Sequence, residues 1–468
     1  MNQRVAVLNV VGLCERHLGP ATPRITTYAR SHSIARIDPV LPAVTCSAQS
    51  TYLTGLPPAS HGAVANGWYD RELSEVHFWK QSNHVVRGKK LWESLREVVP
   101  GITCAKLFWW YNMFSTADYS MTPRPMYPAD GRKVFDVYSW PYDIRPAIKK
   151  DLGEFPFPGF WGPAAGVASP AGGRDCATQW IAASARWIED KYSPDLSLVY
   201  LPHLDYNLQR WGPSDPRIEK DLGEIDEIVG DLLGFYERRG VRVALLSEYG
   251  ITSVSRPVAL NRVFRKEGWV VVKEELGREI LDCGQSRVFA VADHQCAHVY
   301  VSDRSLLHQV RAVLERTEGV EFVWASEDAA AHGLNHSRSG DLVVMAASDS
   351  WFTYYYWMED SRAPDFARCV DIHRKPGYDP AELFLDPQLS APRLHIAWRL
   401  LQKKLGFRML MDVIPLQAEC VRGSHGARPK DPADFPVLVL PGKPTMNRDI
   451  ASTDVFGLLR ALCLGEGR

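Results

Sequence analysis

The sequence lacks an excess of charge of either sign, and it lacks long apolar runs. Its 54 basic and 55 acidic residues give a formal net charge of -1, so we expect no global attraction to a nucleic acid polymer or an anionic membrane. No apolar run reaches the roughly 20 residues of a transmembrane helix, and membrane insertion is not expected. The residues before Val5 show no signal peptide and lead directly into a predicted strand, so the expected location is cytoplasmic.

The cysteines lack the spacings of a metal-binding or disulfide framework. There are nine, an odd number, and no two of them form a CxxC pair. This pattern argues against a zinc finger or a disulfide-stabilised scaffold and indicates reduced thiols. Internal repeats, low-complexity tracts and long linkers are absent as well.

What the sequence does contain is an alternation of apolar runs and amphipathic stretches. The runs Val5 to Gly12, Leu196 to Leu201 and Val241 to Leu246 predict buried parallel strands. Between them, residues 176–192 and 218–238 have apolar side chains at spacings of three and four, which predicts helices. This order predicts an α/β fold with a parallel sheet. Ligand sites of such folds lie beyond the carboxyl ends of the strands, and near those ends the sequence has Asn9, His203, Asp205 and Glu248.

The segment from Leu41 to Asp70 predicts an anion site at the start of a helix. Pro42 disfavours helix before the segment, Thr45 stands where a helix can begin, and residues 47–54 can pack that helix closely. A hydroxyl at a helix N-terminus lies beside free N–H groups and positive dipole, which favour a phosphoryl or sulfuryl group. Asn66 could donate to the same anion. The alternative is an ordinary helix cap followed by a turn, and these residues alone leave both interpretations open.

These thirty residues resemble the alkaline phosphatase superfamily, in particular its type I phosphodiesterase and nucleotide pyrophosphatase branch and the related phosphonoacetate hydrolase. The nucleophilic Thr of that family and the positions after it are matched here by Thr45, Thr54-Gly55, Pro58, His61-Gly62, Asn66 and Tyr69-Asp70. The resemblance implies an alkaline-phosphatase-like three-layer α/β sandwich with a mostly parallel central sheet. It implies that Thr45 is the nucleophile, while Asn66 and the backbone N–H of Cys46 hold the non-bridging oxygens. Cys46 is a rival nucleophile, but Thr45 holds the family position.

The family signatures also bear on domain organisation. A length of 468 residues is that of about three domains, yet the signatures stretch from residue 5 to residue 436. We therefore predict one alkaline-phosphatase-like domain over residues 1–468. Two segments are expected to be inserted into it as caps: residues 71–175, which are rich in aromatic, Pro and Gly residues, and residues 251–400.

The motifs that hold two divalent ions in the family are altered here. The Asp of the first strand falls on Val11, and the Asp-xxx-His motif keeps Asp205 but ends in Gln209. The Asp-His-Gly motif becomes Glu248-Tyr249-Gly250, and only the late His-Gly motif, at His425, is intact. Because an amide is a poor Zn²⁺ ligand and valine cannot be one, the usual two-metal site is not expected.

Two explanations of the altered motifs stay open. In the first, other residues take over and hold one or two divalent ions, most readily Zn²⁺, with Mn²⁺ or Fe²⁺ as alternatives. The predicted ligands are then Asp205, Glu248, His294, His373 and His425, and Asp293 and Asp371 would orient the imidazoles. In the second, metal binding is lost, and the chain binds a phosphorylated or anionic metabolite without turning it over.

The first explanation predicts a metal-dependent hydrolase of phosphate esters, of the phosphodiesterase or nucleotide pyrophosphatase type. It would work through a phospho-threonine intermediate at Thr45 and act on a small phosphate ester or anhydride. Lys106 and Arg374 are expected to neutralise a second substrate charge. The aromatic run Phe108 to Tyr111 could contact the substrate, although such a run more often belongs to the core. The oligomeric state is left open.

Overall fold

A twisted sheet of nine strands runs through the described part of the chain. The computed structural model describes residues 3–130, 132–166, 176–442 and 447–466. The strand order is β21-β2-β20-β9-β1-β8-β5-β6-β7. In that order the strands span Asp449–Ala451, Ser33–Asp38, Val437–Leu440, Arg242–Leu246, Val5–Val10, Leu196–Leu201, Cys104–Leu107, Tyr119–Pro123 and Val137–Trp140.

The pairing is mostly parallel. β1 pairs in parallel with β8 and with β9, and β5 pairs in parallel with β6 and β8. β20 is antiparallel to both of its neighbours, and β7 is antiparallel to β6. The predicted α/β class and mostly parallel central sheet are therefore confirmed.

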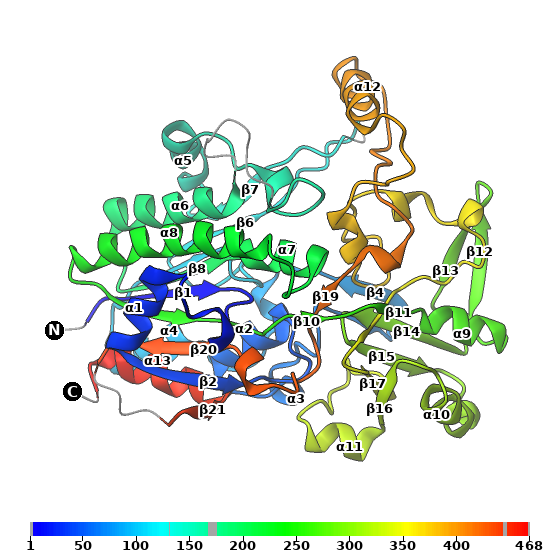
Figure 1. Cartoon of the computed structure of the whole chain (residues 1–468), viewed down its shortest axis with the longest axis horizontal. Helices are drawn as coiled ribbons and strands as arrows, with labels where there is room; N and C mark the ends of the chain where they lie inside the picture. Colours follow the sequence, from blue (N-terminus) through cyan, green and yellow to red (C-terminus); the bar gives the residue numbers. More distant parts are fainter. Residues whose placement is uncertain (1–2, 131, 167–175, 443–446, 467–468) are drawn as a thin grey trace.

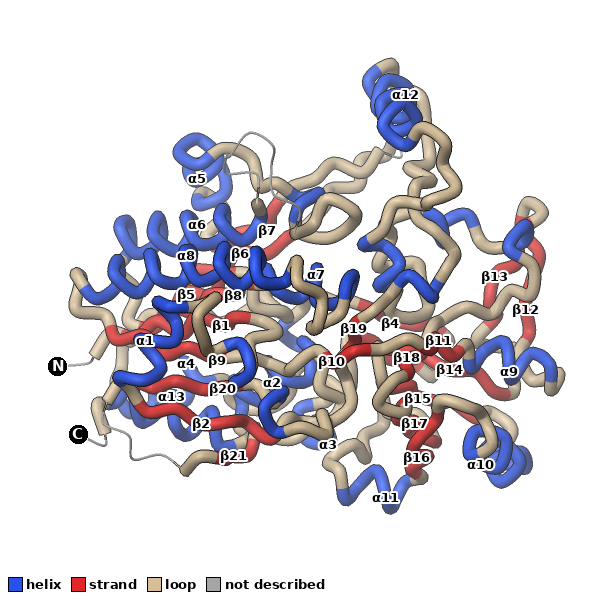
Figure 2. Tube along the Cα trace, in the orientation of Figure 1, coloured by secondary structure: helices blue, strands red, loops and turns tan. Residues whose placement is uncertain are grey.

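Helices cover both faces of this sheet, as the ribbon and tube views show (Figures 1 and 2). One layer contains α6 (Ala177–Tyr192) and α8 (Ile218–Glu237), which pack on β8 and β9, together with α1 (Pro23–Ser31). The other contains α2 (Thr45–Thr54), α4 (Leu91–Val98) and α13 (Asp454–Leu464). With both faces covered, β1 and β8 are buried along their whole length, which explains their continuous apolar sequences.

A second group of strands forms the other half of the molecule (Figure 1). Its main sheet has the order β14-β15-β17-β16, and these strands span Val288–Asp293, Cys296–Val301, Leu342–Ala346 and Val320–Trp324. Around it lie α9 (Leu260–Lys266), α10 (Leu307–Glu315) and α11 (Ser326–Ala331). Four small two-stranded sheets complete the set: β3–β4 (Gly67–Asp70, Glu75–Phe78), β10–β19 (Thr252–Ser253, Gly423–Ser424), β11–β18 (Arg256–Val258, Ser350–Phe352) and β12–β13 (Val271–Glu275, Arg278–Asp282).

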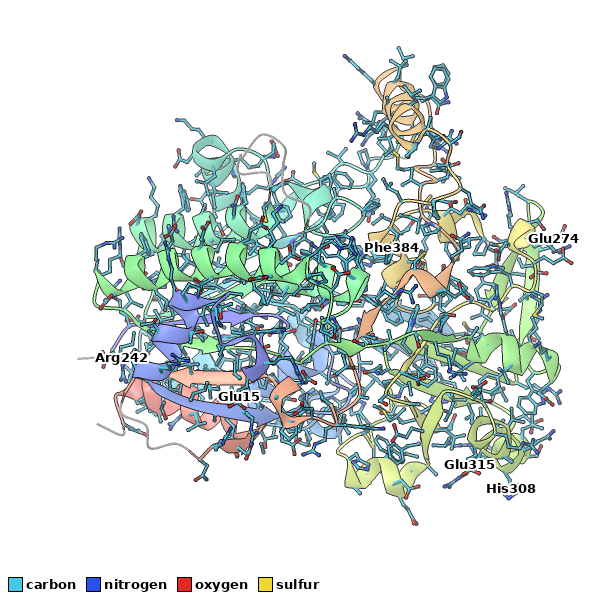
Figure 3. All side chains as sticks on the ribbon, viewed as in Figure 1. Glu15, Arg242, Glu274, His308, Glu315 and Phe384 are labelled. Carbon is cyan, nitrogen blue, oxygen red and sulfur yellow. The ribbon has the colours of Figure 1, made fainter. Side chains whose placement is uncertain are left out.

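The side chains labelled in Figure 3 come from both halves of the molecule. Glu15 and Arg242 lie with the central sheet, whereas Glu274, His308 and Glu315 lie at the outer side of the second half. Four further helices are α3 (Pro58–His61), α5 (Ile144–Leu152), α7 (His203–Trp211) and α12 (Pro392–Lys404), and α12 projects from the body in Figure 1. Within the described ranges, no helix is both long and apolar enough to cross a membrane.

The expected first cap, residues 71–175, is not separate from the central sheet. Three strands that lie within residues 71–175, β5, β6 and β7, belong to the central sheet, so this stretch is partly framework. Their short sequences, such as Cys104–Leu107, do not stand out from the aromatic and Pro-rich surroundings. By contrast, the strands between Arg256 and Phe352 pair only among themselves.

Gly423, in β19, packs directly against the backbone of α7. A Cβ atom at this position would lie 2.0 Å from the carbonyl oxygen of Leu208 in α7, a distance that no side chain tolerates. β19 leads into His425, and α7 carries Asp205 and Gln209. The absence of a side chain at Gly423 therefore lets these two segments meet.

We predict that Gly423→Ala lowers the free energy of unfolding by about 1–3 kcal/mol, because the added methyl group must push β19 away from α7. Urea-induced unfolding measures this change. The matched control is Gly223→Ala in α8, where nothing lies within 4 Å of the added atom, and a gain of up to about 1 kcal/mol is expected there. Equal effects of the two substitutions would contradict the close contact.

Candidate active site

A pocket opens beyond the carboxyl ends of the central strands, and Thr45 lies in its wall. The pocket holds about 910 Å³ of space, including its open mouth. Thr45 is the first residue of α2, after Val44 in extended conformation, and its side chain is buried. The wall around it is mostly aromatic and includes Trp79, Trp110, Phe160, Trp161, Tyr200, Tyr206, Tyr249 and Tyr378.

Three side chains form a chain of hydrogen bonds that starts at Thr45. The Tyr249 hydroxyl lies 3.2 Å from Thr45 Oγ1 and donates to Asp205 Oδ1 over 3.1 Å. Because the hydroxyl proton of Tyr249 goes to Asp205, the Tyr249 oxygen is free to accept from Thr45. Glu248 and Tyr200 also lie within hydrogen-bonding reach of the Thr45 hydroxyl. Burial raises the pKa of Asp205 to about 7, against the lowering effect of hydrogen bonds from Tyr249 and Gln209. Asp205 can therefore take up a proton near neutral pH.

Four rings stack in a row behind this chain. Tyr249 stacks on His425 with 3.5 Å between ring centroids, His425 lies 3.7 Å from His294, and His294 lies 3.6 Å from Tyr378. Tyr378 ends the row by donating to Gln209 Oε1 over 2.9 Å. The stack fixes the orientation of the Tyr249 ring, and with it the position of the hydroxyl.

Each imidazole in the stack is held through its Nδ1. His425 Nδ1 lies 2.7 Å from the carbonyl oxygen of Ala43, and His294 Nδ1 lies 2.7 Å from Asp293 Oδ1. Burial lowers the pKa of both histidines well below the ordinary value. Both are therefore neutral, with the proton on Nδ1 and a lone pair on Nε2.

Glu248 is not part of the pocket lining but lies within hydrogen-bonding reach of Thr45. Its carboxylate accepts hydrogen bonds from the side-chain amides of Asn9, on β1, and Gln49, on α2. Burial raises its pKa to about 8, although these bonds lower it. Glu248 therefore ties β1, β9 and α2 together at the carboxyl edge of the sheet.

Asn66 joins the two halves of the molecule. Its side-chain oxygen accepts from the backbone N–H of Cys46 over 3.0 Å, and its amide nitrogen donates to Asp293 Oδ1 over 3.0 Å. The backbone N–H of Asn66 donates to the other oxygen of Asp293 over 2.7 Å. The two donors expected to hold a substrate anion are thus bonded to other protein groups in this structure.

The two cations expected to bind substrate lie elsewhere. Lys106 is buried, and its Nζ donates to the carbonyl oxygens of Trp110 and Tyr111 over 2.7 and 2.8 Å. Arg374 is exposed and pairs with Asp371. Neither side chain lines the pocket, whereas Lys133 and His373 do.

Sequence reasoning brought Thr45, Asp205, His294, His373 and His425 to one pocket, and the structure places all five in its wall. It missed the bridging role of Tyr249 and the ring of Tyr378. The sequence did offer a clue to Tyr249. This residue stands where the family has the His of its Asp-His-Gly motif, and a buried phenol hydroxyl usually needs a hydrogen-bond partner. Tyr378 follows a Pro-Gly turn that carried no such signal.

Comparison with known proteins identifies the same architecture. The family model described as Type I phosphodiesterase / nucleotide pyrophosphatase matches residues 5–379. A Schizosaccharomyces pombe protein described as an uncharacterized pyrophosphatase/phosphodiesterase is 24% identical over 256 residues, which make up 52% of this chain and 44% of that protein. The match thus spans less than half the length of this curated relative.

Two solved structures share the fold. One is an inactive Thr-to-Ala variant of murine ectonucleotide pyrophosphatase/phosphodiesterase 5 in complex with AMP, with a TM-score of 0.57, 15% identity, and coverage of 99% of this chain and 96% of that one. The other is phosphonoacetate hydrolase from Sinorhizobium meliloti 1021 in complex with phosphonoformate, with a TM-score of 0.60, 14% identity, and coverage of 98% and 96%. The predicted alkaline-phosphatase-like fold and the predicted resemblance are confirmed.

The family generally depends on divalent metal ions, but these residues do not fit its pair of ions. The expected imidazole positions hold Gln209, whose oxygen accepts from Tyr378, and Tyr249, which bridges Thr45 and Asp205. Glu248 and His373 are bonded to other groups, the Gln49 amide and the carbonyl oxygen of Phe78. In the part of the chain that the structure describes, the only three metal-ligating side chains with all ligand atoms within 4.8 Å of one another are His203, Asp221 and Glu224. The five predicted ligands therefore do not converge on one ion.

We predict that Lys106→Met lowers the free energy of unfolding by about 1–3 kcal/mol, because two buried carbonyl oxygens lose their donor. Urea-induced unfolding measures the loss. The control is Lys89→Met, since Lys89 is an exposed lysine paired only with Glu97, and a change within about 0.5 kcal/mol is expected for it. An unchanged stability of Lys106→Met would show that this ammonium is not a structural donor.

Proposed function

Because the chain belongs to the type I phosphodiesterase / nucleotide pyrophosphatase family, we propose that it hydrolyses a small phosphate diester or anhydride through Thr45. The observation that carries this proposal is the hydrogen-bond chain from Thr45 through Tyr249 to Asp205 at the wall of the pocket. The loss of a threonine in the inactive murine relative supports it. So do the phosphorus-containing ligands of the two solved relatives, AMP and phosphonoformate.

The geometry gives Thr45 a path for its proton. As Thr45 Oγ1 attacks phosphorus, its proton passes to the Tyr249 oxygen, while the Tyr249 proton passes to Asp205 Oδ1. The bond from phosphorus to the leaving group breaks, and a phospho-threonine remains. Water then attacks the phosphorus and releases a phosphate monoester from Thr45, Asp205 returns its proton to Thr45 along the same path, and the proton lost by the water goes to solvent. In this account, protein groups carry out the activation that the metal ions provide in the family.

The remaining wall of the pocket defines the substrate class. Trp79, Trp110 and Trp161 offer apolar faces, and Lys133 supplies a positive charge. These groups suit an ester whose leaving group is flat and apolar, such as an aryl or nucleobase-bearing group, with a negative charge near the rim. The unpartnered Nε2 of His294 lies in the same wall and can accept a hydrogen bond from the substrate.

A second candidate function follows from one observation. The positions that hold the ions in the family carry Val11, Gln209 and Tyr249 here, and the two polar ones are bonded to neighbouring side chains. Such a site could bind a phosphorylated metabolite without turnover. The two functions differ in whether removal of the Thr45 hydroxyl changes a measurable rate.

We predict that Thr45→Ala lowers kcat/KM for bis-p-nitrophenyl phosphate by about 10³-fold or more, because the attacking oxygen is lost. Release of p-nitrophenolate measures the rate. Thr45→Ser keeps an oxygen at the same place, so it should retain more activity than Thr45→Ala. No turnover by the wild-type protein, or equal rates of wild type and Thr45→Ala, would favour the binding protein.

We predict that Tyr249→Phe lowers kcat by about 10²–10⁴-fold with little change in KM, because the path for the Thr45 proton is broken. The ring and its stack on His425 are kept in this variant. The matched control is Tyr206→Phe, which removes a pocket-wall hydroxyl that has no hydrogen-bond partner among the described residues. If the two variants lose the same amount of activity, Tyr249 has no special role in activating Thr45.

A further inference from the structure

A cluster of metal-ligating side chains lies outside the pocket, between α7 and α8. His203 is the first residue of α7, and Asp221 and Glu224 stand three residues apart on α8, which places both carboxylates on the same face of that helix. One ligand atom from each of the three side chains lies within 4.8 Å of the other two. His203 Nε2 and Glu224 Oε2 are 3.1 Å apart.

Two buried polar atoms in this cluster form no well-aligned hydrogen bond with the residues that the structure describes. They are His203 Nε2 and Asp221 Oδ2, on residues that are only 2% and 4% exposed. Glu224 Oε2 forms an ion pair with Nε2, whereas Asp221 Oδ2 has no hydrogen-bond partner among the residues that the structure describes. A buried acceptor without a partner is unfavourable, so Asp221 Oδ2 calls for a compensating group.

Cys176 sets the orientation of the His203 ring. Its Sγ lies 3.8 Å from His203 Nδ1, at the start of α6. Against the lowering effect of burial, hydrogen bonds with Cys176 and Glu224 raise the pKa of His203 to about 10. An ion that binds on the side of the two carboxylates therefore displaces the Nε2 proton, while the Nδ1 proton stays directed at the sulfur. A hydrogen bond at one imidazole nitrogen that fixes the tautomer is typical of histidines that bind metal through the other nitrogen.

The donors suit one divalent ion. One imidazole nitrogen and two carboxylate oxygens form a ligand set for Zn²⁺, which binds such atoms at about 2.0–2.2 Å and takes water in a fourth position. Such a site needs donors about 3.3–3.6 Å apart; His203 Nε2 and Glu224 Oε2 are 3.1 Å apart, and all three ligand atoms lie within 4.8 Å of one another. The Glu224 side chain is 32% exposed, which gives the ion a route from solvent.

We propose that His203, Asp221 and Glu224 bind one Zn²⁺ ion. The ion satisfies Nε2 of His203 and Oδ2 of Asp221, and it joins the first residue of α7 to α8. Asp205 and Gln209 lie on α7, so the ion braces the wall of the pocket without contacting Thr45. This proposal is independent of the catalytic role of Thr45.

The test is Zn²⁺ titration by isothermal calorimetry of the full chain after chelator treatment and dialysis. We expect wild type to bind one equivalent, and Glu224→Gln to weaken its binding about tenfold or more. The matched control is Glu219→Gln, since Glu219 is an exposed residue of the first turn of α8, and its affinity should equal that of wild type. His425→Gln changes the His of the intact family His-Gly motif, and this variant should also bind Zn²⁺ with wild-type affinity.

Two outcomes overturn the proposal. One is a wild-type protein that binds no Zn²⁺, or that binds it as tightly after Glu224→Gln as before. The other is a loss of the bound ion in His425→Gln, which would place the ion in the pocket instead. If circular dichroism shows that Glu224→Gln is unfolded, Asp221→Asn is the second variant, and it must show the same loss of Zn²⁺ affinity.

Discussion

The Tyr249 hydroxyl is the group on which the arrangement of the pocket depends. Asp205 is buried, and a buried carboxylate is costly unless it accepts hydrogen bonds. Tyr249 supplies one of these bonds, and because its proton is used there, its oxygen is free to accept from Thr45. One phenol therefore satisfies a carboxylate and orients a hydroxyl. Nearby, the Gln209 oxygen accepts a hydrogen bond from Tyr378, so the second altered position of the motifs is also held by a neighbouring tyrosine.

The framework holds this hydroxyl from two directions. Within the central sheet, Glu248 binds Asn9 and Gln49, so the loop that carries Tyr249 is anchored to β1 and α2. From the second half, Asp293 at the end of β14 binds Asn66 and orients His294, and His294 packs on His425 behind the Tyr249 ring. The geometry of the site thus depends on contacts between segments that lie more than two hundred residues apart in the sequence.

The sequence predicted the parts of the fold that are set by local patterns. The apolar runs were sufficient to predict β1 and β8, and the apolar spacing was sufficient to predict α6 and α8. The start of α2 at Thr45 was also predicted. β5, β6 and β7 could not be recognised, because they are only four or five residues long and lie among aromatic and Pro-rich segments. For the site, the sequence pointed to Thr45 and Asp205, which both line the pocket, while their roles stay predictions. The partners of Lys106, Asn66 and Tyr249 depend on tertiary contacts that no local pattern records.

The central claim is that the proton of Thr45 moves to Asp205 through Tyr249. The measurement that tests it most directly is kcat/KM in mixtures of H₂O and D₂O, with an ester slow enough that the chemical step limits the rate. Two protons move together in this account, so the rate is predicted to fall along a curve as the deuterium fraction rises. A linear fall would mean that a single proton moves, and an absent isotope effect would mean that none does. Either result would contradict the role assigned to Tyr249.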